Sequence, residues 1–440
     1  MTMNKTEVLA AIEKSLTPMR DLPQGYLKTG RLLHVGTTLL NAYLPGVFMG
    51  ELCCLLPEGT LAEVVGIDGV TVQLSPFAST AGLYCGQKVR SLGRRHRVPV
   101  GEDLLGRVLD GMGLPLDDGP APQGPWRDYD APPPSPLLRQ LIEKPMLIGI
   151  RAIDGLLTCG EGQRVGIFSA AGVGKSTLMS MLCRSPDSDI NVLVLIGERG
   201  REVIEFIEKT LGSETRRRCV MVVSTSDRPA LERMRALWVA TTIAEAFRDR
   251  GKRVLLFADS LTRYARAARD IALARGEVAA SGSYPPGVFA ALPRLLERAG
   301  KGTLGSITAF YTVLVESDDM NEPLADEVRS LLDGHIILSR RLAEAAHFPA
   351  IDVLASLSRL MPMVASVEHR ELANAIRQLL SVYRDVELLV RIGEFVRGED
   401  PQADRAVERY SDICHFLQQQ SNEPCNLDEL LAQMRYLTDI

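Results

Sequence analysis

The hydrophobic pattern along the chain changes twice, and each change predicts a domain boundary. Residues 26–92 carry short alternating apolar segments separated by glycine, such as GRLLHVG and LAEVVGIDG, which favour a small antiparallel β-barrel. In the next predicted domain, residues 93–360, apolar runs such as NVLVLIG alternate with helical stretches and indicate an α/β fold whose parallel sheet is buried on both faces. A helical domain over residues 361–440 is predicted from apolar residues at helical spacing, which include Leu372, Ile376, Leu379 and Tyr383.

Two further segments lack these patterns. Residues 1–25 carry charges throughout and no apolar stretch followed by a cleavage site, so they are not a secretion signal. They predict either a short amphipathic segment that contacts other subunits or membrane-side partners, or a frayed terminus. The proline-rich stretch GLPLDDGPAPQGPWRDYDAPPPSP cannot continue a helix or a central strand, and it predicts an extended connection over the surface.

The composition narrows the class of protein. Of the 440 residues, 46% are hydrophobic and 24% are charged, and the net charge of −5 provides no global basic field that would attract nucleic acid. The longest apolar runs are strand-sized and too short to cross a membrane. Eight cysteines without an export signal or metal-ligand spacing predict reduced thiols rather than disulfides or a metal centre. We therefore expect a cytoplasmic protein of several domains.

The stretch FSAAGVGKSTLMSML predicts a phosphate-binding loop. It follows an apolar strand and opens a helix, which is the context that the pattern G-x-x-x-x-G-K-[ST] requires, and a chance glycine turn is the alternative. Ser169 replaces the first glycine of the pattern at the strand end, where a small residue is tolerated. The lysine would reach the β- and γ-phosphates of ATP, and the serine after it would ligate Mg²⁺. The predicted nucleotide-binding residues of the loop are Ala171, Gly172, Val173, Gly174, Lys175, Ser176 and Thr177.

Two carboxylates at strand ends are candidates for the remaining chemistry. Asp259 ends the apolar run RVLLFAD in the Walker B arrangement, and it can hold magnesium directly or through water. Glu198 follows NVLVLIG and is a candidate base that orients and polarises the attacking water, with Arg199 beside it as a candidate phosphate ligand. An ordinary ion pair at a strand end explains Glu198 and Arg199 equally well, so the spacing leaves both interpretations open.

The combined motifs GVGKST, IGERGREV, FADSLTRYARAARDIA and YPPGVFAALPRLLERAG resemble the rotary-type ATPases, and among these the ATPases of type III protein secretion. The stretch NAYLPGVFMGELCCLLPEG is especially similar to the virulence-system branch that occurs in Salmonella. The likeness runs from about residue 26 to the C-terminus. It implies a RecA-like ATPase domain that binds ATP and Mg²⁺.

The resemblance also implies roles for single residues. It implies that Glu198 is the carboxylate that activates water, that Arg199 lies near the γ-phosphate, and that Asp259 is the Walker B acid. Arg359 in DVLASLSRLM is similar to the arginine finger that reaches a neighbouring subunit's nucleotide, and Phe348 is similar to an aromatic that packs on adenine. The chain departs from the family at one loop position, since Ser317 stands where glycine is usual.

The partners are likewise implied by the resemblance alone. It implies a homohexamer at the cytoplasmic base of a secretion apparatus, peripheral to the inner membrane. The implied partners are a central stalk protein, a stator or regulator protein, the export gate and chaperone–effector complexes. By the same likeness, ATP turnover would release chaperones, help to unfold cargo and export effectors.

Three other functions remain open. A catalytic or regulatory subunit of an ATP synthase shares the fold, but it would need a second type of chain, whereas this chain carries both Glu198 and Arg359. A flagellar export ATPase differs only in its degree of likeness. A hexameric nucleic-acid motor is supported only by the short runs RRHR and RRR, which in an acidic chain are better explained as solvated surface.

Overall fold

The computed structural model of the chain describes residues 28–170, 172–280, 284–315 and 322–439. The described residues form two compact units, one ending at His96 and the other beginning at Arg97. The predicted N-terminal segment 1–25 lies outside the described residues, as do Ala171 and Ser317. None of the helices within the described ranges is long and apolar enough to span a membrane.

The first unit is a closed antiparallel barrel whose neighbouring strands follow the order β1-β2-β5-β4-β3-β6. Every second side chain of a strand points inward, so residues such as Leu32, Val64 and Leu74 form the barrel core. The last strand continues three residues past the predicted boundary at residue 92. The strands are β1 (Thr29–Val35), β2 (Leu40–Tyr43), β3 (Glu51–Leu56), β4 (Thr60–Asp68), β5 (Thr71–Pro76) and β6 (Lys88–Arg95).

The second unit is built on a nine-stranded sheet with the path β19-β18-β12-β17-β15-β13-β14-β8 and with β16 paired to β17. The pairs from β18 to β8 are parallel, so their carboxyl ends meet at one edge of the sheet. The strands are β8 (Val108–Leu109), β12 (Arg164–Ser169), β13 (Ile190–Ile196), β14 (Cys219–Ser224), β15 (Arg253–Asp259), β16 (Gly300–Lys301), β17 (Ser306–Leu314), β18 (Gly334–Ile337) and β19 (Leu357–Ser358).

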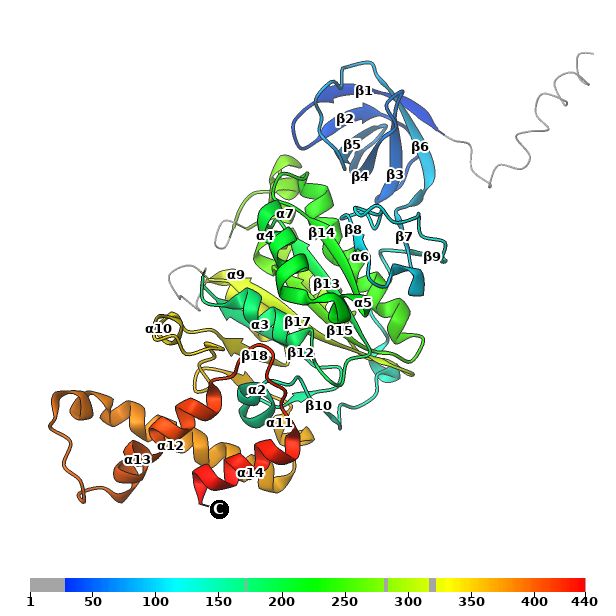
Figure 1. Ribbon diagram of the computed structural model, residues 1–440. Helices are drawn as coiled ribbons and strands as arrows, with labels where there is room; N and C mark the ends of the chain where they lie inside the picture. Colours follow the sequence, from blue (N-terminus) through cyan, green and yellow to red (C-terminus); the bar gives the residue numbers. More distant parts are fainter. Residues whose placement is uncertain (1–27, 171, 281–283, 316–321, 440) are drawn as a thin grey trace, which may run out of the picture. The chain divides into compact units, whose positions relative to one another are not determined.

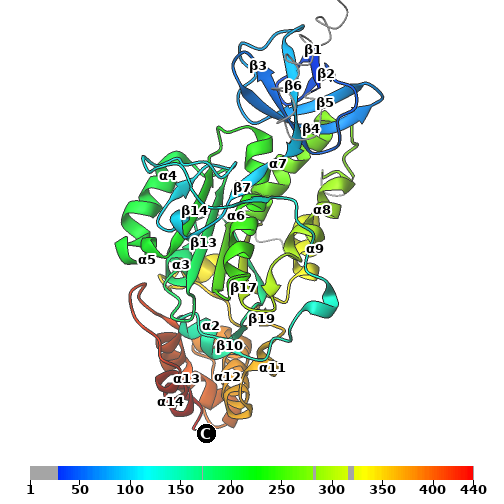
Figure 2. The ribbon, with the colours of Figure 1, turned by 90° about the vertical axis from the view of Figure 1, so that its right-hand side faces the viewer.

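Both faces of this sheet are buried, as the continuous apolar runs predict. In β13, Val192 and Val194 enter one hydrophobic cluster, whereas Leu193 and Leu195 enter the other. Helix α6 (Ala230–Arg248) lies across β13, β14 and β15 on the first of these faces (Figure 2). The other helices between Lys175 and Glu344 are α3 (Lys175–Leu182), α4 (Gly200–Glu205), α5 (Ser213–Arg217), α7 (Leu261–Ala274), α8 (Pro286–Leu296), α9 (Pro323–Leu331) and α10 (Arg340–Glu344), with a π-helical turn at Phe206–Leu211.

The C-terminal residues form the predicted helices, which are α12 (Val367–Ile392), α13 (Pro401–Leu417) and α14 (Leu427–Thr438) after a short α11 (Met361–Val364). Figure 1 shows them in orange and red beside α2 (Arg151–Leu156). Leu372, Ile413 and Met434 belong to the same hydrophobic cluster as the P-loop helix residue Leu178. The helices therefore share a continuous core with the sheet.

The proline-rich connection is extended, but it does not run entirely over the surface. Its β9 (Trp126–Asp128) pairs with β7 (Arg97–Pro99), and two short 3-10 turns flank this region at Glu102–Leu104 and Pro136–Leu138. The next residue, Tyr129, is only 2% exposed and contacts Trp238 of α6 edge to face. Its carbonyl accepts a hydrogen bond from the fully buried Arg298. A small ladder of β10 (Pro145–Met146) and β11 (Cys159–Gly160) follows.

Candidate active site

The phosphate loop has the predicted strand–loop–helix context. Strand β12 ends at Ser169, and α3 begins at Lys175. Gly172 and Gly174 have φ values of 82° and 86°, a left-handed conformation that side chains disfavour, which explains glycine at both positions. Ser169 is 1% exposed, so the serine that departs from the pattern is accommodated inside the fold. Its hydroxyl has no hydrogen-bond partner among the described residues.

The carboxyl ends of β12, β13 and β15 bring the predicted residues to one cavity of about 470 Å³. Three acids line it: Glu198, which follows β13, Glu202 of α4, and Asp259, which ends β15. The described residues of the loop and of α3 that line it are Ala170, Gly172, Gly174, Lys175, Ser176, Thr177 and Met179, whereas Val173 is buried and contributes to the hydrophobic core. The sequence patterns thus identified residues that share one site.

Charge pairs organise the cavity. Lys175 Nζ lies 2.6 Å from Asp259 Oδ1 and 3.7 Å from Glu198 Oε1. Arg263 Nη2 lies 3.2 Å from the other oxygen of Glu198. Burial raises the pKa of the Glu198 carboxyl, and the nearby Asp259 carboxylate raises it further, whereas Lys175 and Arg263 lower it. The two cations therefore help to keep a buried acid ionised, which is the form that can accept a proton from water.

Arg199 lies at the rim of the same cavity. Its side chain is 76% exposed, and its guanidinium makes an ion pair with Glu202 at 3.2 Å, one turn along α4. An ion pair at the strand end was one of the two interpretations that the sequence left open. The exposed guanidinium still borders the space in which phosphates would lie, so its role as a phosphate ligand stays a prediction.

Phe348 packs against the phosphate loop although it lies 173 positions after Lys175 in the sequence. A Cβ atom added to Gly174 would stand 3.1 and 3.2 Å from two carbons of the Phe348 ring, so glycine at this position also makes room for the aromatic ring. The ring is 39% exposed. This position is consistent with contact to a nucleotide base beside the loop, and that contact stays a prediction.

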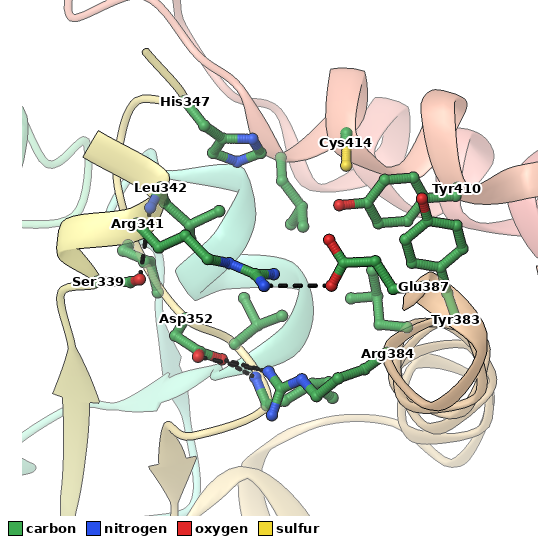
Figure 3. A pocket seen from close by; sticks show the side chains of 15 residues that line it. Ser339, Arg341, Leu342, His347, Asp352, Tyr383, Arg384, Glu387, Tyr410 and Cys414 are labelled. Atoms are coloured by element: carbon green, nitrogen blue, oxygen red, sulfur yellow. Dashed lines mark hydrogen bonds and ion pairs between the residues drawn. The ribbon is translucent and has the colours of Figure 1, made fainter. Parts of the chain in front are cut away.

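The segment that carries Phe348 is attached to the C-terminal helices. The N–H of Gln419 donates to the Phe348 carbonyl at 3.0 Å. A second cavity, of about 280 Å³, is lined by residues of this segment and of the C-terminal helices. Arg341 pairs with Glu387 of α12 at 3.1 Å, and Arg384 pairs with Asp352 at 3.1 Å (Figure 3). The rings of Tyr383 and Tyr410 stack at 3.4 Å on the far wall. The Gln419 hydrogen bond and the two ion pairs attach the residues on either side of Phe348 to the C-terminal part of the chain.

Arg359 is not among the described residues that line the nucleotide cavity. It directly follows β19 and is exposed. Its backbone N–H donates to the Asp333 carbonyl at 3.0 Å, and its side-chain Nη2 donates to the Arg329 carbonyl at 3.4 Å. The role of Arg359 as an arginine finger for a neighbouring subunit therefore stays a prediction.

Known proteins share this architecture over nearly the whole chain. Residues 149–358 match the model of the ATP synthase alpha/beta family nucleotide-binding domain, and residues 365–436 match the model of the type III secretion EscN ATPase C-terminal domain. The SPI-2 type 3 secretion system ATPase of Salmonella typhimurium is 65% identical over 433 residues, which are 98% of this chain and 99% of that protein. The chain belongs to the type III secretion ATPases. Its reaction is therefore the hydrolysis of ATP.

A solved structure of this family shows the same fold. Assembled EscN of enteropathogenic E. coli, in complex with its central stalk EscO, aligns with a TM-score of 0.87 and 50% identity over 93% of this chain and 100% of that chain. The predicted barrel, parallel-sheet domain and helical C-terminus are thereby confirmed. The flagellum-specific ATP synthase of Bacillus subtilis is 45% identical over 97% of this chain and 98% of that protein. The flagellar alternative is thus a more distant likeness than the secretion ATPase of Salmonella.

Two residues of the site were missed by the sequence analysis. Arg263 lies in the first turn of α7, four residues after Asp259, and its side chain lines the cavity. Thr312 lies near the end of β17, between apolar residues. Its hydroxyl oxygen, Oγ1, lies 2.9 Å from Asp259 Oδ1. The signal that could have identified Thr312 is a polar residue inside an apolar run of strand length.

Proposed function

We propose that the cavity at the carboxyl ends of β12, β13 and β15 is the site of ATP hydrolysis, with Lys175 and Arg199 as phosphate ligands and Glu198 as the group that activates water. The observation that carries this proposal is the position of Lys175, whose Nζ lies within ion-pair distance of both Glu198 and Asp259. The N-terminal amides of α3 and the lysine provide the positive field that a triphosphate requires.

The donor set of the cavity fits magnesium. The Ser176 hydroxyl in the first turn of α3 and the Asp259 carboxylate line the same space, and both are hard oxygen ligands of the kind that Mg²⁺ prefers. When bound, magnesium would offset the negative charge of the β- and γ-phosphates. We assign Ser176 as a ligand and Asp259 as a ligand or a hydrogen-bond partner of a magnesium-bound water.

Glu198 would act on the attacking water. The water oxygen forms a bond to the γ-phosphorus while the bond to the β,γ-bridging oxygen breaks, which yields ADP and phosphate, and the carboxylate orients the water and takes up its proton. Burial raises the pKa of Glu198, which strengthens it as a base, while Arg263 and Lys175 oppose this shift and favour the ionised form.

We further propose that each site is completed by Arg359 of an adjacent subunit in a homohexamer. The exposed position of Arg359 supports this proposal, and so does the assembled state in which the EscN relative was solved. An arginine finger offsets the charge of the transferred phosphoryl group and is worth roughly 10³–10⁵ in rate. An isolated subunit would then be a poor enzyme.

The cellular role follows from the family. We propose that this ATPase acts at the cytoplasmic base of a type III secretion apparatus, peripheral to the inner membrane, where it drives chaperone release, cargo unfolding and export. The EscN complex with EscO supports a central stalk partner. A stator or regulator protein, the export gate and chaperone–effector complexes are the other proposed partners, and nucleic acid is not one.

Cross-complementation tests this role. The protein is expressed in a Salmonella typhimurium strain that lacks its SPI-2 ATPase and, separately, in one that lacks its flagellar ATPase. We expect effector secretion to return in the first strain and motility to stay lost in the second. A Glu198→Gln variant should restore neither. Restored motility with absent secretion would show that the flagellar alternative is correct.

A further inference from the structure

Thr312 lies on β17, which pairs with β12 on one side and with β15 on the other. Strand β12 leads into the phosphate loop, and β15 ends in the Walker B acid, Asp259. In the sheet, Thr312 is opposite Ile167 of β12, and the preceding residue of β17 is opposite Ala258 of β15. Its side chain is 0% exposed. A buried hydroxyl is costly unless it is hydrogen-bonded, so a threonine at this place in an apolar strand calls for a polar partner.

That partner is the carboxylate of Asp259. Thr312 Oγ1 lies 2.9 Å from Asp259 Oδ1 and 3.2 Å from the carbonyl oxygen of Ala258. A hydroxyl has one hydrogen to donate, and an ionised carboxylate is a stronger acceptor than a neutral carbonyl. Asp259 Oδ1 is also the oxygen that Lys175 Nζ reaches at 2.6 Å. Two donors, one neutral and one cationic, therefore share the same carboxylate oxygen.

Nucleotide binding would affect the two donors, Lys175 and Thr312, differently. The lysine of a phosphate loop reaches the β- and γ-phosphates when a triphosphate is bound, which weakens its hold on Asp259. Thr312 is fixed in a central strand and stays where it is. We infer that Thr312 is a positioning residue for magnesium, because its hydroxyl keeps the Asp259 carboxylate oriented toward the metal of MgATP once Lys175 has turned to the phosphates. This inference rests on the proposed role of Asp259.

The test measures how strongly magnesium and nucleotide support each other's binding. The dissociation constant of a fluorescent N-methylanthraniloyl ADP is determined in EDTA and in Mg²⁺, and the ratio of the two constants gives the coupling between metal and nucleotide. Loss of an outer hydrogen-bond partner typically costs 10–100-fold in metal affinity, so Thr312→Val should reduce this ratio by about 10-fold while the value in EDTA stays unchanged. Thr312→Ser keeps the hydroxyl and should restore the ratio.

Thr308→Val is the matched control. Thr308 lies four residues earlier on β17, so its side chain points to the same face of the sheet, and it is also 0% exposed. Its hydroxyl accepts the Gly162 N–H at 2.8 Å and lies at the opposite end of the strand from the cavity. The substitution removes the same atoms from the same strand, and the ratio should stay at the value of the unsubstituted protein.

The outcomes separate this inference from the proposed site. Coupling that is lost in Asp259→Asn but retained in Thr312→Val would overturn the role of Thr312 and leave the magnesium site standing. Equal losses in Thr312→Val, Thr312→Ser and Thr308→Val would also overturn it, since they would reflect a disturbed strand. An unsubstituted protein without coupling, or an Asp259→Asn variant that keeps it, would refute the metal role of Asp259 and the inference together.

Discussion

Arg263 and Glu198 form an ion pair of 3.2 Å inside the nucleotide cavity, although the two residues come from different strand–helix connections. Lys175 approaches the opposite oxygen of the same carboxylate at 3.7 Å. Glu198 is therefore flanked by a cation on each side in a position where burial and Asp259 both favour its protonated form. The balance between these influences decides whether the carboxylate can act on water.

Glu198→Gln should abolish turnover and preserve nucleotide binding. The amide keeps the shape of the side chain but cannot take up a proton, and loss of a positioned general base typically costs 10²–10⁴-fold. Phosphate release measures the loss, and fluorescence of N-methylanthraniloyl ATP measures binding. Glu205→Gln is the control, because Glu205 makes exposed pairs with Arg201 and Lys209 on the outside of α4. Undiminished hydrolysis in Glu198→Gln would remove this residue from catalysis.

Arg263→Gln should move the acid limb of the pH–rate profile to higher pH. The arginine lowers the pKa of Glu198, so its removal raises that pKa. Glu198 acts in its ionised form, so the rise of activity on the acid side moves to a higher pH when the opposite charge beside it is lost. The profile of kcat/KM reports the shift. Arg263→Lys keeps the charge and should leave the limb close to its original position, whereas an unmoved limb in Arg263→Gln would contradict the assignment.

Arg359→Ala should slow hydrolysis by about 10³-fold or more without loss of assembly or nucleotide binding. Its mixture with Lys175→Ala then tests action across the interface. In randomly mixed rings, about one quarter of the sites would join an intact phosphate loop to an intact arginine, so part of the activity should return. Native mass spectrometry confirms that mixed rings form. Mixed rings as inactive as their parents would show that Arg359 serves its own subunit or no site at all.

Phe348→Ala should raise the KM for ATP by about 10-fold with little change in kcat, because stacking of a base on an aromatic ring is worth about 1–3 kcal/mol. Steady-state kinetics separates the two constants. Phe348→Tyr keeps the ring and should keep the KM. A fall in kcat at constant KM would indicate that Phe348 supports the phosphate loop through its contact with Gly174 rather than binding the base.

Local patterns were sufficient for the parts of this protein that depend on neighbouring residues. The loop around Lys175 could be identified because its glycines, lysine and serine act within a few residues of one another. Glu198 and Asp259 could be identified because apolar runs of strand length end at them, and parallel strands place their carboxyl ends at one edge. The same periodicity indicated the barrel, the buried sheet and the C-terminal helices.

Tertiary structure alone decided the contacts between distant segments. These contacts depend on the order in which the strands pair in the sheet, and hydrophobic periodicity does not indicate that order. They are the packing of Phe348 on Gly174, the ion pair of Arg263 with Glu198, and the hydrogen bond from Thr312 to Asp259. For the same reason the proline-rich connection was expected at the surface, whereas Tyr129 is buried against α6. Periodicity shows which face of a segment is buried, and only the fold shows what it is buried against.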